Sequence, residues 1–254
     1  VMRAITGPRL ISELLILGGL SCVFWTLTFQ TTLKYIFLTL RADNNGEGGI
    51  FSLFTLVRRR RRWLYLPAII GGGFLLADGI ITPPISISSA IEGLREYNEG
   101  ISTVPIVITI LVALFLLQQF GTSKVGRIFG PVMVLWFTMI GTFGAASLAG
   151  NPGVLQALNP MWAARLLTQY PEGFWLLGAV FLCTTGAEAL YSDLGHCGRG
   201  NIRVSWIYVK ICLLLSYFGQ GAFLLSHAGE TLAQVKAAAG TDNPFYAIVP
   251  QWFL

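Results

Sequence analysis

Apolar residues in this chain gather into long runs, separated by short segments rich in glycine, proline, asparagine and arginine. A run of about 18 or more mostly apolar residues is long enough to cross the hydrocarbon of a bilayer as a helix. The pattern therefore predicts an all-α integral membrane protein. Six transmembrane helices are predicted, near residues 11–40, 64–92, 104–118, 130–149, 174–194 and 202–226, and a further span is predicted to start within 244–254.

Composition supports a membrane protein and argues against a water-soluble one. The 254 residues are 54% hydrophobic and 11% charged, whereas about a quarter of the residues in soluble domains are charged. The basic pI of 9.2 could indicate nucleic acid, but most lysines and arginines fall in loops beside the predicted spans. Such placement reflects membrane topology, so no nucleic-acid partner is expected. The four cysteines lack metal-type spacing and are expected to be free thiols.

The basic loops predict an orientation. Lysine and arginine are more frequent in the loops that follow the first, third and fifth spans, which makes these loops cytoplasmic. The arginine run at 58–62 is expected to contact anionic lipid headgroups there. This orientation puts Val1 outside the cell with no preceding span, so we expect the chain to be a piece of a longer one.

The second predicted span contains several polar residues. Asp78, Thr82 and Ser86 recur every four residues and therefore share one helix face. Pro83 and Pro84 lack N–H groups, so two carbonyls one turn earlier lose their helical donors. Hard oxygen ligands of this kind suit an alkali cation. The alternative is a proline kink, with hydroxyls bonded to the backbone and the acid paired with a base. No basic residue lies nearby in the span, which favours a cation site.

The fifth predicted span contains a second acid. Thr185 and Glu188 are three residues apart and share a face, and Gly186 between them weakens helical continuity. Because burial disfavours a charged carboxylate, Glu188 is a candidate proton carrier. The alternative is a structural acid that stays protonated or hydrogen-bonded. Asp193 and His196 are expected at the membrane interface, without a catalytic role.

No enzymatic motif is found in the sequence. The segment "RADNNGEGG" at 41–49 lacks the alternating acids and closing glutamate of an EF-hand, and is predicted to be a turn followed by a short helix. There is no nucleophile–base pair, phosphate-binding loop or HExxH motif. The protein is therefore not expected to be an enzyme.

Five segments, in order, resemble the KUP/HAK/KT potassium uptake permeases and cover essentially the whole chain: "LKYIFLTLRADNNGEGGIFSL", "DGIITPPISISSAIEGL", "FGTSKVGRIFGPVMVLWF", "NPMWAARLL" and "TTGAEALYSDLGHCG". The resemblance implies a proton-coupled potassium importer of the amino acid–polyamine–organocation superfamily. It also implies a partial LeuT-like fold, in which two inverted five-helix repeats hold the ion at mid-membrane. Residues 1–254 would then be a fragment of a single transmembrane transporter domain.

The same resemblance implies a site and partners. Potassium would bind at Asp78, Thr82 and Ser86 of the family's third helix and at Thr185 and Glu188 of its broken sixth helix. Glu188 or Asp78 would carry the proton. The implied partners are potassium, protons and the lipid bilayer of the cell membrane, with no cofactor, and a homodimer is left open. The family's first helix, with its own acid and tyrosine, and the later second-repeat helices are missing from this chain.

Alternative functions remain at this stage. An amino acid or polyamine transporter of the same superfamily would use Asp78 and Glu188 to bind a substrate ammonium. A potassium channel would need a carbonyl filter of the TVGYG type, and the sequence has none. A purely structural membrane subunit would leave both acids unexplained.

Overall fold

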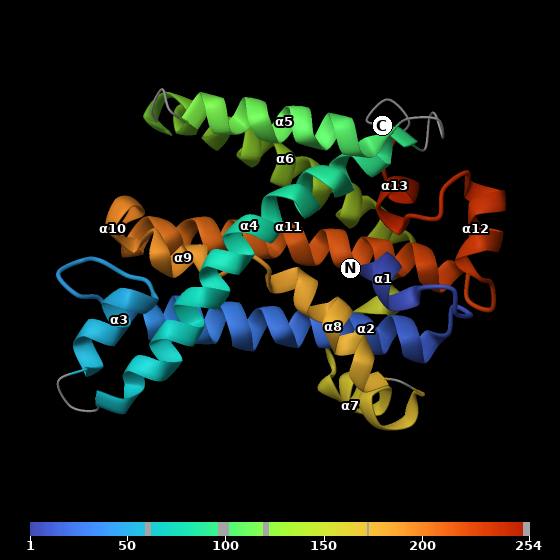
Figure 1. Cartoon of the computed structure of the whole chain (residues 1–254). Coiled ribbons are helices and arrows are strands. Elements are labelled where there is room, and N and C mark those ends of the chain that lie inside the picture. Colours follow the sequence, from blue (N-terminus) through green and yellow to red (C-terminus); the bar gives the residue numbers. More distant parts are fainter. Residues whose placement is uncertain (59–61, 96–101, 119–121, 172, 251–254) are drawn as a thin grey trace. The chain divides into compact units, whose positions relative to one another are not determined.

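The computed structural model describes residues 1–58, 62–95, 102–118, 122–171 and 173–250, and its regular structure is helical (Figure 1). The chain forms two compact units. Unit 1 comprises residues 1–34, 135–185 and 203–254, and unit 2 comprises residues 35–134 and 186–202.

The helices of unit 1 are α1 (Met2–Thr6), α2 (Glu13–Thr26), the 3₁₀ helices η4 (Pro152–Leu158) and η5 (Leu182–Thr184), α7 (Pro160–Gln169), α8 (Gly173–Phe181), α12 (Leu232–Ala239) and α13 (Pro244–Ile248). Most of the π-helix η1 (Leu27–Leu38), of α6 (Thr122–Gly150) and of α11 (Arg199–Ser226) also belongs to this unit. Unit 2 contains η2 (Thr39–Arg41), α3 (Ile50–Val57), η3 (Arg62–Leu64), α4 (Tyr65–Arg95), α5 (Thr103–Gln118), α9 (Ala189–Ser192) and α10 (Leu194–Cys197).

Five of the six predicted spans correspond to helical segments that are long and apolar enough to cross a membrane: Glu13–Arg41, Tyr65–Ile91, Phe129–Gly150, Gly173–Ser192 and Arg199–Ser226. The span predicted at 104–118 corresponds to a shorter apolar helix, Thr103–Leu116. The segment 244–254 begins with the short α13, and its last residues, 251–254, lie outside the described residues. The protein is thus a multi-pass integral membrane protein.

The core of unit 1 is built around α2. Its residues from Leu15 to Val23 are buried, and they pack against α1, α7 and α8. A helix that is apolar on all sides is stable only when neighbours cover it completely. Close packing is possible because Gly18 faces α7, where a Cβ atom would come within 2.5 Å of Leu166 Cβ.

The helices α6 and α11 contact each other through their backbones within unit 1. A Cβ atom on Gly144 would overlap the carbonyl of Leu215, and one on Gly219 would lie 2.5 Å from the carbonyl oxygen of Gly144. The hydroxyl of Ser147 donates a hydrogen bond to the carbonyl of Gly219 at 2.9 Å. Small residues at such crossings stabilise membrane helices because backbones can approach closely.

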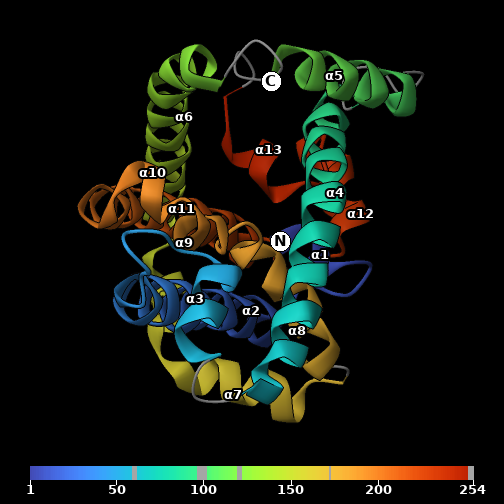
Figure 2. The ribbon, with the colours of Figure 1, turned by 60° about the vertical axis from the view of Figure 1, so that its left-hand side comes forward.

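In unit 2, α4 continues without interruption through Pro83 and Pro84 (Figure 2). The amino-terminal half of α4 packs on α3, where Gly72 faces the ring of Phe51. Large apolar side chains such as Phe74, which is 71% exposed, cover the outer surface of α4. Such a surface is suited to lipid or to other apolar helices rather than to water.

We predict that Gly144→Val destabilises the protein, because the added side chain cannot fit between α6 and α11. Overpacking of this kind costs about 1–3 kcal/mol. Thermal unfolding in detergent should therefore show a lower Tm for this variant. The control is Gly150→Ala in the same helix, where a Cβ atom meets no atom within 4 Å. An equal Tm for the two variants would contradict the packing described above.

Candidate cation site

The fifth span is broken close to Glu188. After α8 and η5, Thr185 has a non-helical ψ of 131°, and Gly186 has a φ of 82° that favours glycine. Glu188 is the N-cap of the short α9, and its carbonyl accepts a hydrogen bond from Ser192 N–H at 3.1 Å. The break expected at Gly186 is therefore present, and it leaves backbone N–H groups without intrahelical partners.

Asp78 and Thr82 lie on one face of α4, as predicted. The Thr82 hydroxyl donates a hydrogen bond to Asp78 Oδ1 at 2.7 Å. Both residues are half-buried, whereas Ser86, one turn further along, is exposed. The carboxylate of Asp78 is thus oriented by its own helix, because a side chain four residues away is within direct reach.

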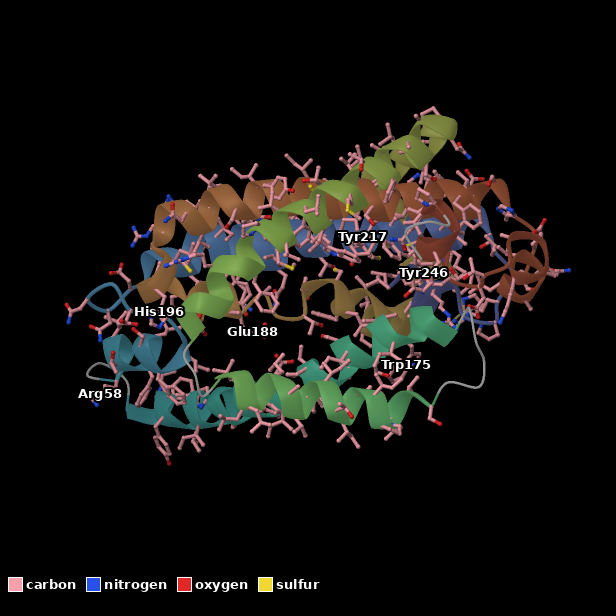
Figure 3. The ribbon with its side chains drawn as sticks, turned by 90° about the horizontal axis from the view of Figure 1, so that it is seen from above. Arg58, Trp175, Glu188, His196, Tyr217 and Tyr246 are labelled. Carbon is pink, nitrogen blue, oxygen red and sulfur yellow. The ribbon has the colours of Figure 1, made fainter. Side chains whose placement is uncertain are left out.

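Glu188 and Asp78 lie near each other within unit 2. Figure 3 labels Glu188 among the side chains of the structure. Their carboxyl groups lie near enough to each other to interact through their charges. Two carboxylates so close together repel each other, which favours a cation or a proton beside them. The two acids predicted from separate motifs therefore form one carboxyl pair, together with the hydroxyl of Thr82.

Tyr35 also belongs to this neighbourhood, and the sequence interpretation missed it. Tyr35 lies on η1, in the part of that π-helix that belongs to unit 2, and it interacts electrostatically with Glu188. π-Helical turns are uncommon and often occur at functional sites. A tyrosine within an apolar span was the only sequence signal available, and such residues are too frequent in this chain to stand out.

Thr185 lies in a different unit from the other four predicted site residues. It is exposed and belongs to unit 1. Within unit 2 the structure brings together the side chains of Asp78, Thr82 and Glu188. Asp193 and His196, expected at the interface, are both exposed. The arginine run expected to contact lipid falls partly on 59–61, which are outside the described residues.

A second polar cluster, in unit 1, was also missed. Lys210 of α11 donates hydrogen bonds to Thr28 Oγ1 at 3.2 Å and to Thr32 Oγ1 at 3.0 Å, next to the ring of Phe24. Thr32 also accepts from Trp206 Nε1 at 3.0 Å and donates to a backbone carbonyl. Its hydroxyl is therefore fully used, with one donated and two accepted hydrogen bonds.

The chain matches the family model described as "K+ potassium transporter integral membrane domain" over residues 2–254, so the chain belongs to this family, which comprises potassium transporters and not enzymes. This confirms the resemblance to the KUP/HAK/KT permeases.

Curated relatives carry the same description. A "Probable potassium transport system protein Kup" of Cytophaga hutchinsonii is 62% identical over 259 residues, which cover 100% of this chain and 38% of that relative. A protein of the same description from Flavobacterium psychrophilum is 60% identical over 254 residues, which cover 100% of this chain and 38% of that relative. "Probable potassium transport system protein Kup 1" of Lactococcus lactis is 55% identical over 256 residues, which cover 96% of this chain and 37% of that relative. The chain thus spans less than two fifths of these relatives. No solved structure matches it.

We predict different effects on stability from removing the Lys210 ammonium and from removing the Thr32 hydroxyl that accepts its hydrogen bond. Lys210→Met removes a charge from an apolar span and should leave the Tm in detergent unchanged or raised, because replacing buried ionic groups with apolar ones is often neutral or stabilising. Thr32→Val removes one of the two hydroxyl acceptors of the Lys210 ammonium and the acceptor of the Trp206 N–H, which costs about 1–3 kcal/mol. The double variant should recover part of that loss. A larger loss for Lys210→Met than for Thr32→Val would contradict this account.

Proposed function

We propose that this chain supplies part of the cation site of a potassium importer that couples potassium uptake to protons by alternating access. The observation that carries the proposal is the carboxyl pair of Asp78 and Glu188, with the Thr82 hydroxyl bonded to Asp78. Ionisable groups within apolar spans are costly, so a functional role is the default explanation for them. Membership of the potassium transporter family supports the choice of cation.

The charge of the pair supports symport. Two carboxyl groups that share one proton carry a single net negative charge, which one potassium ion would neutralise. Potassium and a proton would then occupy the site together, and the neutral complex would be cheaper to occlude in the membrane than a charged one. In this mechanism, Asp78 and Thr82 provide oxygen ligands in place of water, and Glu188 holds the proton. Ser86 and Thr185 are proposed as further hydroxyl ligands.

The proposed architecture is the LeuT-like fold in the cell membrane. A span broken at Gly186, beside an acid, is the feature expected of the discontinuous helices in that fold. Because the chain spans 38% of its relatives, transport itself is proposed for the full-length protein encoded by the gene that contains these residues.

We predict that purified full-length protein in liposomes takes up rubidium and acidifies the lumen at the same time. Asp78→Asn should reduce uptake at least about tenfold, since the variant loses a charged ligand that stabilises the bound cation. Glu188→Gln should stop uptake or should separate it from the pH change. Asp193→Asn is the matched control, because Asp193 is an exposed acid near Glu188, and it should transport normally.

Each other outcome rejects a defined part of the proposal. Rubidium uptake without acidification, in wild-type protein, would exclude proton symport. Normal coupled uptake by Asp78→Asn and Glu188→Gln would exclude the site. Uptake of an amine with no rubidium uptake would favour an amino acid or polyamine transporter of the same superfamily.

A further inference from the structure

The loop at residues 42–49, named the strap below, folds as a tight hairpin in unit 2. Asn44 and Glu47 exchange backbone hydrogen bonds at 2.9 and 3.1 Å. Between them Asn45 and Gly46 have φ values of 55° and 88°, as a type I′ turn requires at both central positions. The N–H of Gly46 donates to Asp43 Oδ2 at 3.0 Å. The predicted turn is confirmed, and three hydrogen bonds hold it.

The strap is also fixed to the helix that follows it. The Asn44 side chain donates to the Thr55 hydroxyl at 3.0 Å, and the Ser52 hydroxyl donates to the Glu47 carbonyl at 2.9 Å. Both partners lie on α3, which packs against α4. The strap is therefore bonded to α3, which packs against α4, the helix that carries Asp78.

The strap also contacts the segment that follows Glu188. The Tyr191 hydroxyl donates to the Ala42 carbonyl at 2.5 Å, and Tyr191 is only 4% exposed. Arg199 Nη2 donates to Asp43 Oδ1 at 2.7 Å. Asp43 thus uses one carboxylate oxygen inside the strap and the other on Arg199.

Glycines allow the two segments to touch closely. A Cβ atom on Gly48 would overlap the carbonyl of Tyr191, and one on Gly195 would lie 2.5 Å from Glu47 Oε2. Glycine is the residue that lets a backbone approach another surface this closely. The contact between the strap and α9–α10 is therefore an extended one.

Glu188 needs support of this kind. The chain is broken before it at Gly186, and α9 after it has only four residues. A single helical turn is not stable by itself, because it fixes many dihedral angles for few hydrogen bonds. Since the Glu188 carbonyl is bonded into α9, any shift of α9 also moves Glu188 relative to Asp78.

We propose that the strap positions Glu188 for cation binding, with Asp43, Tyr191 and Arg199 as positioning residues. The inference rests on the proposed function, because it assumes that the pair of Glu188 and Asp78 binds the transported cation. The strap forms no part of the site itself. It holds α9, and α9 in turn holds the Glu188 carboxyl against Asp78.

The test measures rubidium uptake into liposomes by full-length protein, across rubidium concentration and pH, for Tyr191→Phe and Asp43→Asn. Each variant should raise the KM for rubidium about threefold or more with little change in maximal rate, because a loosened ligand weakens binding first. Each should also shift the pH at which uptake is half-maximal. Asp43→Glu keeps the charge, so it should change the KM and the pH profile less than Asp43→Asn does.

Two matched controls come from unit 1. Tyr208→Phe removes a hydroxyl hydrogen bond to Thr138 of 2.7 Å, and Asp242→Asn removes the ion pair with Arg3 at 2.9 Å, which is exposed to a similar degree as that of Asp43 and Arg199. Both controls should keep the wild-type KM and pH profile.

The outcomes separate the two proposals. If Glu188→Gln impairs uptake but the strap variants leave KM and pH profile unchanged, the strap proposal is wrong and the site proposal stands. The strap proposal is also wrong if the controls change KM as much as the strap variants do. If Glu188→Gln itself leaves uptake and its pH dependence unchanged, both proposals fail.

Discussion

Hydrocarbon offers no hydrogen-bond partner to the backbone, so a membrane span can be interrupted only where protein or a water-filled cavity supplies one. The fifth span is interrupted at Thr185 and Gly186, and helical hydrogen bonding resumes at Glu188, the N-cap of α9, whose carbonyl accepts from Ser192 N–H. The break and the acid thus lie within one turn of each other, and the break sets where Glu188 enters the short α9.

Threonine hydroxyls stabilise charges of both signs within the spans. A hydroxyl donates to the carboxylate of Asp78, and two others accept from the ammonium of Lys210. This is possible because a hydroxyl has one proton to give and two lone pairs to share. Around Lys210 these hydroxyls lie at the start of η1, where the helix widens from α to π, so the lysine is held where the spacing of the helix changes.

The sequence predicted those features that depend on local pattern. The long apolar runs predicted six spans, five of which correspond to helices of membrane-spanning length, because hydrophobic length is the dominant constraint in a bilayer. The four-residue spacing placed Thr82 beside Asp78 because helix geometry fixes that neighbour. The meeting of Asp78 with Glu188, the contact of Tyr35 with Glu188, and the threonine partners of Lys210 could not be predicted in this way. Each joins segments far apart in sequence, and neither hydropathy nor periodicity records such pairs. The twelve-residue π-helix Leu27–Leu38 was also not predicted, since no composition rule distinguishes a π-helix from an α-helix.

The two acids differ in how firmly the fold holds them. Asp78 lies in the middle of a helix that continues through two prolines, and Thr82 fixes its carboxylate from the next turn. Glu188 lies on a single turn after a break. In the proposed mechanism a site must bind the ion tightly and then release it, which a uniformly rigid ligand set would hinder. One ligand on a continuous helix and another on a short, externally supported turn meet both demands, because binding strength then varies with the position of one element. The strap contacts are suited to such a role, since the ion pair of Asp43 and Arg199 is partly exposed and exposed ion pairs are individually weak.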